Sequence, residues 1–382
     1  MKRFICVVLV IVLASAALPL QASAVELDVG GKSAILMDAA TGTVIYEKNA
    51  HEPLPPASVT KVMTMLLIME AIDSGKINWD DQVVASEAAA AKGGSQIYLK
   101  VGESMSVSDM VKSIAVSSAN DCACAMSEHI AGSESAFVDM MNARAKELGM
   151  NDTHFVNCTG LDDSENAKDH KTSAHDIALM SRELLTKHPD IKKFTTIWMD
   201  TVRNGQFGLS NTNKLVRFYR GATGLKTGFT SGAGYCLSAS AERDGMEMIA
   251  VVMGCESSAE RFAACKSMLD YGFANYAVID PSLDAPVTVK VKLGVSNTVN
   301  AVPAVKESLL IEKGQKNLVN IRTEAETEVT APVSQGQRLG TLSIQVGDQV
   351  ISQVPLVAET AVPKLSWGQV FLDVLRQMCG CR

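Results

Sequence analysis

Strand-like segments lie at both ends of residues 33–275, and helix-like segments occupy the stretch between them. The strand-like segments are short apolar runs bounded by turn residues, such as Arg243-Asp-Gly245 between the last two. Apolar strands from both ends of one stretch can bury their faces in a common sheet, which the intervening helices then cover. The pattern therefore predicts an α/β domain with a helical insert. The expected strands are residues 33–38, 43–47, 225–229, 235–242 and 246–253.

The helix expected from Ser58 to about Asp73 is too apolar to lie on a surface, so it is predicted to be central and buried. A second helix start is indicated by Ser173 and Asp176, whose spacing is that of a capping box. Further helices are expected at residues 106–114, 121–129, 135–148 and 261–275.

A change of periodicity follows a plausible linker at residues 280–284. Residues 287–293 alternate apolar and polar side chains, which is typical of a strand with one buried face. That face would carry Val287, Val289, Val291 and Leu293. Two later apolar runs flank Gly347-Asp348 and predict a hairpin. Residues 280–362 are therefore expected to form a small all-β domain, acting as a spacer or a binding module.

The first 24 residues have the pattern of a secretory signal peptide. Lys2 and Arg3 precede an apolar run over residues 4–18, and Ala22-Ser-Ala24 offers a cleavage site. The alternative is an uncleaved anchor. Either way the protein is expected to be exported and to work in the cell-wall space, at the outer face of the cytoplasmic membrane. Residues 25–279 would then form the first folded domain.

The last 20 residues, 363–382, are expected to form an amphipathic helix. Trp367 and Phe371 lie on its apolar face and would suit anchoring in a membrane interface. The segment is too short and too polar on one face to span a bilayer. The alternative is that this face packs against the β domain or a partner chain.

Composition limits the classes of partner and cofactor. The formal net charge of −7 and the low aromatic content of 5% argue against nucleic-acid binding, which needs a basic surface. Removal of the signal peptide would leave eight cysteines, without the spacing of a disulfide framework. We interpret them as small buried side chains, with disulfides as the alternative. No His/Cys cluster has zinc spacing, so neither a metal nor a cofactor is expected.

Ser58 and Lys61 are the first candidates for catalysis. Three residues apart on a helix, their hydroxyl and amine would face the same side. A serine hydroxyl needs a base, and a lysine can serve if burial or a nearby cation lowers its pKa toward 7. The free N–H groups at the helix start, including that of Ser58, could stabilise an oxyanion. The alternative for Ser58 is a simple helix cap.

Two further motifs complete the candidate site. In Ser118-Ala-Asn120, Ser118 could relay a proton to a leaving amine, and Asn120 could bind a substrate amide and hold the lysine in place. Each residue could instead cap a helix. In Lys226-Thr-Gly228, Lys226 would supply the second cation and attract a substrate carboxylate, to which Thr227 could donate. Gly228 would leave room for the substrate along the strand, and the Phe229 N–H would be the second oxyanion donor. The alternative is an ordinary strand with an exposed lysine.

The three motifs, in this order, resemble those of the serine-type D-alanyl-D-alanine carboxypeptidases, the low-molecular-mass penicillin-binding proteins. The resemblance covers residues 27–276 closely and extends more weakly to the β domain and the tail. It is carried by Pro-Ala-Ser58-Val-Thr-Lys61, Ser118-Ala-Asn120-Asp, Thr159-Gly-Leu-Asp162 with His170, Asn211-Thr-Asn-Lys-Leu215 and Gly224-Leu-Lys226-Thr-Gly228.

The resemblance implies the antiparallel sheet with helical insert that β-lactamases and penicillin-binding proteins share. It also implies removal of the terminal D-Ala from peptidoglycan stem peptides. Ser58 would attack the penultimate carbonyl, Lys61 would take its proton, and Ser118 would help to protonate the departing D-Ala. β-Lactam antibiotics would acylate Ser58 and remain bound. Some family members carry Arg where this chain has Thr212, so carboxylate recognition would rest more on Lys226 and Thr227.

Other functions share parts of this pattern. A class A-like β-lactamase uses the same trio but needs a Glu-x-x-x-Asn loop, and this chain has only Glu165-Asn166 in that region. A non-catalytic penicillin-binding sensor or scaffold would be expected to lose one motif. A D,D-endopeptidase or weak transpeptidase would keep all of them and stays open. We interpret His170 as a structural loop residue.

Overall fold

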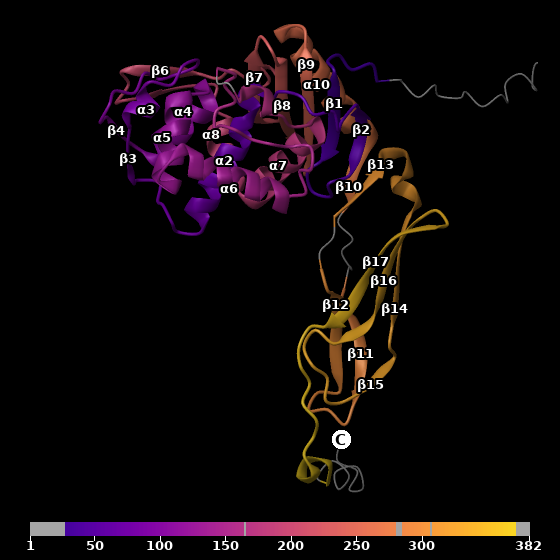
Figure 1. The fold of residues 1–382 in the computed structure, drawn as a ribbon. Helices are drawn as coiled ribbons and strands as arrows, with labels where there is room; N and C mark the ends of the chain where they lie inside the picture. Colours follow the sequence, from indigo (N-terminus) through magenta and orange to yellow (C-terminus); the bar gives the residue numbers. More distant parts are fainter. Residues whose placement is uncertain (1–26, 164–165, 280–284, 306–307, 372–382) are drawn as a thin grey trace, which may run out of the picture.

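The structure is a computed structural model that describes residues 27–163, 166–279, 285–305 and 308–371. The predicted signal peptide (1–24) and the linker (280–284) lie outside the described residues. Figure 1 shows a body of sheet and helices from which an elongated β domain projects.

The core of the body is the predicted antiparallel sheet, built from strands of both ends of the segment. Its order is β2-β1-β9-β8-β7, so strands far apart in sequence are neighbours. The type of hairpin predicted at Arg243-Asp-Gly245 is present, with positive φ at Asp244 (51°) and Gly245 (76°). The strands are β1 (Ser33–Asp38), β2 (Val44–Lys48), β7 (Ala222–Thr230), β8 (Gly234–Arg243) and β9 (Met246–Cys255).

Both faces of this sheet are buried. Alternate residues of β9 serve different cores: Ile249 and Val251 pack with the helical insert, while Met248 and Ala250 pack with the closing helix α10 (Ser258–Asn275). On the insert side, α2 (Lys61–Asp73) and α7 (Ala174–Lys187) lie nearest the sheet. This three-layer arrangement confirms the predicted α/β fold with its helical insert.

The insert consists of helices and two small hairpins that surround α2 (Figure 1). Ten of the 13 residues of α2 are buried, as its composition predicted. The other helices are α3 (Glu87–Ala90), α4 (Val107–Ser117), α5 (Asn120–Ala131), α6 (Glu134–Glu147), α8 (Lys192–Thr195) and α9 (Leu215–Phe218). The 3-10 turns are η1 (Ala57–Thr60), η2 (Ala167–Asp169) and η3 (Pro189–Ile191). The hairpins are β3 (Gln82–Val84) with β4 (Ser104–Ser106), and β5 (Met199–Val202) with β6 (Phe207–Ser210).

Two local predictions need correction. The helix expected to begin at Ser58 instead starts as the turn η1, so Ser58 lies inside a 3-10 turn and is not a cap of α2. The capping box at Ser173 is half formed: its hydroxyl accepts from the Asp176 N–H at 3.2 Å. The Asp176 carboxylate instead accepts from the Asp152 N–H (2.8 Å) and the Thr153 hydroxyl (2.7 Å).

The β domain contains a six-stranded sheet of order β14-β16-β17-β12-β11-β15. Val289 and Val291 are buried in it, whereas Leu293 is 49% exposed with φ of +56°, so the predicted buried face stops one position earlier. The predicted hairpin at Gly347 is present. The strands are β11 (Val287–Lys292), β12 (Thr298–Pro303), β14 (Val319–Ala325), β15 (Glu328–Thr330), β16 (Arg338–Val346) and β17 (Gln349–Ala358).

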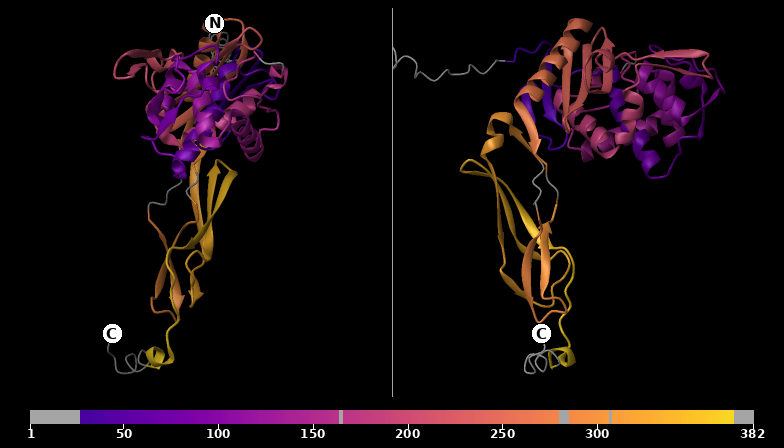
Figure 2. Two further views of the ribbon diagram at one scale, coloured as in Figure 1. Left: turned by 60° about the vertical axis from the view of Figure 1, so that its left-hand side comes forward. Right: turned by 180° about the vertical axis from the view of Figure 1, so that it is seen from behind.

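A second, two-stranded sheet connects the body to the β domain. In it β10 (Tyr276–Ile279), directly after α10, pairs with β13 (Leu309–Glu312), which the turn η4 (Lys313–Leu318) follows. Both views of Figure 2 show the β domain extended away from the body, with the last described residues of the chain at its far end. Across the described ranges, no helix combines the length and hydrophobicity needed to cross a bilayer.

Six of the cysteines are described, and all are buried free thiols, which confirms the interpretation of these six as small buried side chains. They are Cys122, Cys124, Cys158, Cys236, Cys255 and Cys265. Burial raises the pKa of each of these thiols, so they are poor nucleophiles at neutral pH. Cys6, Cys379 and Cys381 lie outside the described residues.

Candidate active site

Ser58 and Lys61 meet as their spacing predicts. The Lys61 amine donates to the Ser58 hydroxyl at 2.9 Å and to the Thr159 carbonyl at 2.8 Å. Lys61 is fully buried as the first residue of α2, whereas Ser58 on η1 is partly exposed. A buried amine therefore contacts a hydroxyl that solvent and substrate can reach.

The surroundings of Lys61 favour its neutral form. Burial lowers the pKa of this amine from 10.5 to about 7, and the Cys158 and Asp121 side chains oppose that shift. Both hydrogen-bond partners of the amine are neutral oxygens. Lys61 can therefore accept a proton near neutral pH, which a lysine with an ordinary pKa cannot do.

A hydrogen bond from His170 holds the turn η1, which carries Ser58. The backbone N–H of Val156 donates to His170 Nδ1 at 3.1 Å, so Nε2 carries the ring proton and donates to Thr60 Oγ1 at 2.7 Å. Thr60 in turn donates to the Ala57 carbonyl at 2.8 Å. Burial lowers the pKa of His170 to about 4, so the ring is neutral. One ring nitrogen thus bonds the turn and the other bonds the backbone of Val156, in agreement with the interpretation of His170 as a structural residue.

Ser118 and Asn120 lie at the junction of two helices. Ser118 caps α4 in the left-handed conformation (φ 62°), and Asn120 opens α5. The Asn120 Nδ2 donates to the Gly93 carbonyl at 2.7 Å, while its buried Oδ1 has no hydrogen-bond partner among the described residues. Lys61 is held by Thr159 rather than by Asn120, which differs from the expected role of this amide.

Lys226, Thr227 and Gly228 lie on β7, the edge strand of the sheet. Alternate backbone groups of an edge strand face away from its neighbour and can pair with an extended ligand. An added Cβ on Gly228 would lie 2.5 Å from the Pro56 carbonyl oxygen and 3.1 Å from the Val59 nitrogen. The glycine is therefore needed for close packing of β7 against the Ser58 turn, and its expected role in leaving room for substrate stays a prediction. This packing brings Phe229 close to the turn.

The electrostatic role of Lys226 differs from the expectation. Burial, then the positive charges of Lys61 and Arg261, lower the pKa of Lys226 well below 10.5. Its amine donates to the Thr227 carbonyl at 2.8 Å. Lys226 was expected to lower the pKa of Lys61, but burial is the main cause at Lys61.

Two participants in this site were not identified from sequence. The Thr159 carbonyl holds Lys61, but a backbone acceptor leaves no mark on residue type. Arg261, on α10, is buried and donates to the Gly228 carbonyl at 2.8 Å. A buried arginine that faces the back of a sheet cannot be distinguished by sequence from an exposed one near a helix start.

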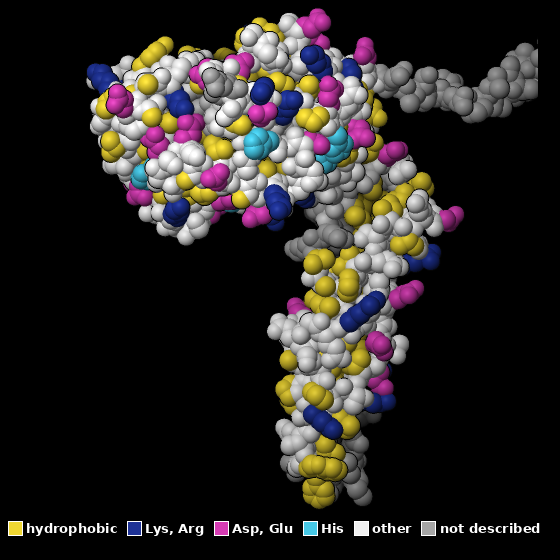
Figure 3. All heavy atoms as spheres, in the orientation of Figure 1, with side chains coloured by type: hydrophobic (Ala, Val, Ile, Leu, Met, Phe, Trp, Pro, Cys, Tyr) yellow, Lys and Arg dark blue, Asp and Glu magenta, His cyan; other side chains and the backbone are white. Residues whose placement is uncertain are grey.

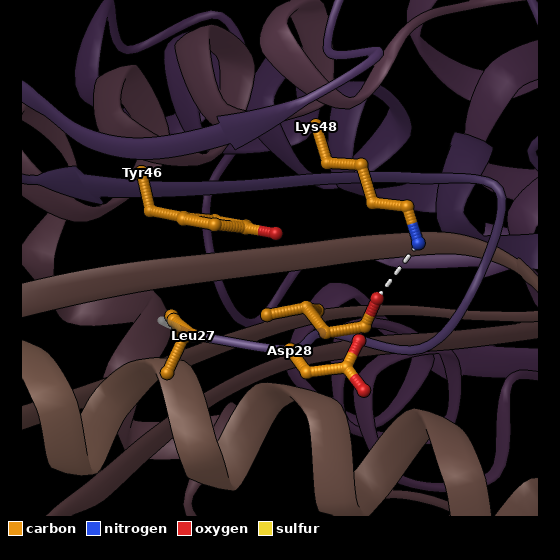
Figure 4. Close-up of a pocket in the computed structure, with 5 residues that line it drawn as sticks. Leu27, Asp28, Tyr46 and Lys48 are labelled. Atoms are coloured by element: carbon orange, nitrogen blue, oxygen red, sulfur yellow. Dashed lines mark hydrogen bonds between the residues drawn. The ribbon is translucent and has the colours of Figure 1, made fainter. Parts of the chain in front are cut away.

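A pocket of about 440 Å³ elsewhere on the body contrasts with this site (Figure 4). It is lined by Leu27, Asp28, Val29, Tyr46 and Lys48, beside β2 at the opposite edge of the sheet from β7. The Lys48 amine there donates to the Val29 and Gly31 carbonyls at 2.8 and 2.9 Å. Lys48 therefore holds the segment around Val29 and Gly31 in place. Unlike Lys61, it has no serine hydroxyl among these partners.

Comparisons with known proteins agree with the geometry. Residues 20–257 match the family model described as D-alanyl-D-alanine carboxypeptidase, and residues 282–364 match that of the penicillin-binding protein 5 C-terminal domain. The D-alanyl-D-alanine carboxypeptidase DacF of Bacillus subtilis is 43% identical over 361 residues, which is 93% of this chain and 90% of the relative.

Solved structures show the same similarity. Penicillin-binding protein 5 from Haemophilus influenzae superposes with a TM-score of 0.76 at 29% identity, covering 88% of this chain and 98% of that one. Penicillin-binding protein D2 from Listeria monocytogenes in its ampicillin-bound form has a TM-score of 0.56 at 31% identity, covering 65% and 98%.

Proposed function

This chain belongs to the D-alanyl-D-alanine carboxypeptidase family, the low-molecular-mass penicillin-binding proteins, and we propose how its own residues carry out the reaction. It is a serine carboxypeptidase that removes the terminal D-Ala from peptidoglycan stem peptides and is inhibited by β-lactams. The observation that carries the proposed roles is the 2.9 Å hydrogen bond between the buried Lys61 amine and the Ser58 hydroxyl.

Acylation begins when neutral Lys61 takes the Ser58 proton and Oγ attacks the penultimate carbonyl carbon. The oxyanion that forms is stabilised by the backbone N–H groups of Ser58 and Phe229. Ser118 passes a proton from Lys61 to the departing D-Ala nitrogen. Water then attacks the ester, with Lys61 again as base, and frees Ser58. Each step uses side chains and backbone groups of this chain, so the scheme needs no cofactor.

Substrate binding uses the edge of β7 and the segment that carries Asn120. The stem peptide lies along β7 as an added strand, and the Asn120 amide faces it. The buried, unpartnered Asn120 Oδ1 supports this placement, since an unmet acceptor costs about 1–3 kcal/mol unless a ligand donates to it. The substrate carboxylate binds the Thr227 hydroxyl and Lys226, and Arg261 adds positive potential behind the strand.

The test is mass spectrometry of the mature protein with a fluorescent penicillin, beside D-Ala release from a pentapeptide, for wild type and Ser58→Ala. A persistent adduct on Ser58, with both adduct and D-Ala release lost in the variant, is expected. Rapid turnover of penicillin without D-Ala release would indicate a β-lactamase. A persistent adduct without D-Ala release would indicate a non-catalytic penicillin-binding sensor or scaffold, and absence of both would indicate an inert binding module. Cleavage of a cross-linked dimer in place of the pentapeptide would indicate an endopeptidase.

The remaining parts of the chain are proposed to place this site. After export directed by residues 1–24, residues 25–279 would form the catalytic domain, 280–362 a spacer and 363–382 a membrane-associating tail. Trp367 is 91% and Phe371 65% exposed at the start of the tail, which supports interfacial anchoring. Figure 3 shows hydrophobic side chains gathered at that end of the β domain, opposite the catalytic domain. The spacer would then hold the active site away from the membrane, toward the cell wall.

Flotation of the mature protein with phospholipid vesicles tests the tail. The full chain is expected to float, and a chain ending at residue 362 is expected to stay in the soluble fraction with unchanged D-Ala release. A double variant, Trp367→Ser with Phe371→Ser, separates anchoring from loss of the whole segment. Equal flotation of all three proteins would show that the tail packs elsewhere.

A further inference from the structure

A second groove lies on the body between the chain segment before β4 and the β5–β6 hairpin. Its volume is about 690 Å³. Figure 1 shows β3, β4 and β6 at the same end of the helical insert. The residues lining it are Tyr98, Lys100, Val101, Gly102, Glu103, Arg203, Asn204, Gln206 and Phe207. None of them has a role in the proposed acyl transfer.

The groove presents one exposed aromatic ring, that of Tyr98, beside Phe207, which packs against the core of the body. Tyr98 is 69% exposed, and its ring meets Phe207 edge-on with centroids 6.4 Å apart. The backbone of Tyr98 is left-handed (φ 58°), as are its neighbours across the groove, Arg203 (54°) and Asn204 (53°). At Arg203 and Asn204 this conformation belongs to the turn of the β5–β6 hairpin. At Tyr98, a bulky residue, it is a costly conformation of the kind found at ligand sites.

The charges lining the groove are largely paired. Arg203 bonds both oxygens of Glu103, at 2.6 and 3.1 Å, and donates to the carbonyls of Ile97 and Tyr98 at 2.7 and 3.3 Å. Its guanidinium also lies 5.4 Å over the Phe207 ring. Arg203 is committed to the wall, and the other cation of the lining, Lys100, lies close enough to Glu103 to help lower the pKa of that carboxyl. Besides these three charged groups the groove offers aromatic surface and the amides of Asn204 and Gln206, which suit a ring bearing hydroxyl and acetamido groups.

The segment that carries Tyr98 is bonded to the start of α5, which carries the candidate substrate-binding residue Asn120. The Asn120 N–H donates to the Ser95 carbonyl at 2.7 Å, and the N–H groups of Ile97 and Leu99 donate to the Asp121 carboxylate at 3.1 and 3.0 Å. Tyr98 is three positions after Ser95, so their Cα atoms lie within about 11 Å. An extended five-residue stem peptide spans about 17 Å. This length exceeds the stretch from Ser95, which Asn120 contacts, to Tyr98, so a peptide that reaches Asn120 has the length to approach this groove.

We propose that this groove binds an N-acetylated sugar of the glycan strand to which the stem peptide is attached. The proposal rests on the carboxypeptidase function and extends it from the peptide to the polymer. The ring stacks on Tyr98, and Asn204 and Gln206 bond its acetamido and hydroxyl groups. The enzyme then prefers stem peptides attached to glycan over free peptides.

The first test compares D-Ala release from one pentapeptide in two forms, free and attached to its N-acetylglucosaminyl-N-acetylmuramyl disaccharide. Wild type is expected to show the higher kcat/KM on the disaccharide form, through KM. Tyr98→Ala should lower that value about threefold to tenfold and leave the free peptide unchanged, while the control Tyr98→Phe retains both values. Equal wild-type values on the two substrates, or an equal loss on both in Tyr98→Ala, would overturn the proposal.

A second test is independent of catalysis. Saturation-transfer NMR with the peptide-free disaccharide is expected to show binding at millimolar concentration to wild type and to Ser58→Ala, and loss of it in Tyr98→Ala. Binding that survives in Tyr98→Ala, or no binding to wild type, contradicts a sugar site here. Failure of D-Ala release from both forms of the pentapeptide would instead reject the proposed function, while this binding experiment still decides the groove.

Discussion

The Thr227 hydroxyl lies 2.7 Å from the Thr212 hydroxyl, to which it donates. The Thr212 N–H donates to the Val116 carbonyl at 3.2 Å, two residues before Ser118. Thr212 therefore joins the substrate-binding strand to the wall that carries Ser118. The structure shows a neutral partner for Thr227, which can reverse its hydrogen bond when Thr227 donates to a carboxylate.

Thr212→Val removes this hydroxyl and keeps the side-chain shape. We expect KM for a D-Ala-D-Ala peptide to rise about fivefold, the equivalent of about 1 kcal/mol for one hydrogen bond, with a smaller change in kcat. Thr212→Ser should restore the wild-type KM. Steady-state kinetics of the three proteins would reveal the role as merely structural if kcat and KM changed together or if the serine variant failed to recover.

The lowered pKa of Lys61 predicts the pH dependence of acylation. Because the neutral amine is the base, the first-order acylation rate at saturating penicillin should rise as pH increases through about 7 and level off above it. Lys61→Arg, which stays protonated, should acylate at least about a hundredfold more slowly. Stopped-flow measurements between pH 5.5 and 9 would contradict this role if the rate were flat.

The lowered pKa of Lys226 predicts that the enzyme takes up protons when a substrate carboxylate binds. Its pKa is lowered well below 10.5 in the free enzyme, and a bound carboxylate favours the charged amine and raises that pKa. Between the two values the complex therefore holds more protons than the free enzyme. Calorimetric titration of Ser58→Ala with a D-Ala-D-Ala peptide, in buffers of different ionisation enthalpy, should report net uptake. The matched Lys226→Arg protein should bind without uptake, and identical enthalpies in all buffers would refute the assignment.

Gly160 provides a test of packing beneath the nucleophile. Its φ is +82°, and an added Cβ would lie 1.8 Å from the Ala57 carbonyl oxygen, so Gly160→Ala must displace the Ser58 turn. Gly75→Ala is the matched control, with φ of +72° and nothing within 4 Å of the new atom. The control should lose about 1–2 kcal/mol of unfolding free energy. Gly160→Ala should lose about 1–3 kcal/mol more, with slower acylation. Equal urea-unfolding midpoints would argue against the close contact.

The lowered pKa of His170 predicts that the folded protein loses stability in acid. Its pKa of about 4 in the folded protein lies below the unfolded value of 6.5, so the unfolded state binds the extra proton. The stability contributed by neutral His170 is present above pH 6.5 and is lost as pH falls toward 4, by at most about 3 kcal/mol. His170→Gln should flatten this part of the stability curve. Urea unfolding at pH 7 and 4.5 would disprove the assignment if both proteins lost equal stability.

Much of this architecture was predictable from local sequence. Alternation placed β11, and turn residues placed the hairpins at Asp244 and Gly347. The apolar composition of α2 predicted its burial. The spacing of Ser58 and Lys61 predicted their contact, since one helical turn sets that distance. Each of these depends on neighbours a few residues apart, which is the range over which sequence patterns carry physical information.

Only the tertiary structure decided how distant segments complete the site. It buried Lys61 beneath the Thr159 carbonyl, placed Arg261 behind Gly228, and paired Thr227 with Thr212. It also showed that Gly228 is small because the Ser58 turn lies against it, and that the buried face of β11 stops before Leu293. The periodicity of a sequence indicates that a side chain is buried, but it does not show which residues pack against that side chain. The pKa of a lysine and the room beside a glycine depend on atoms that only folding brings together.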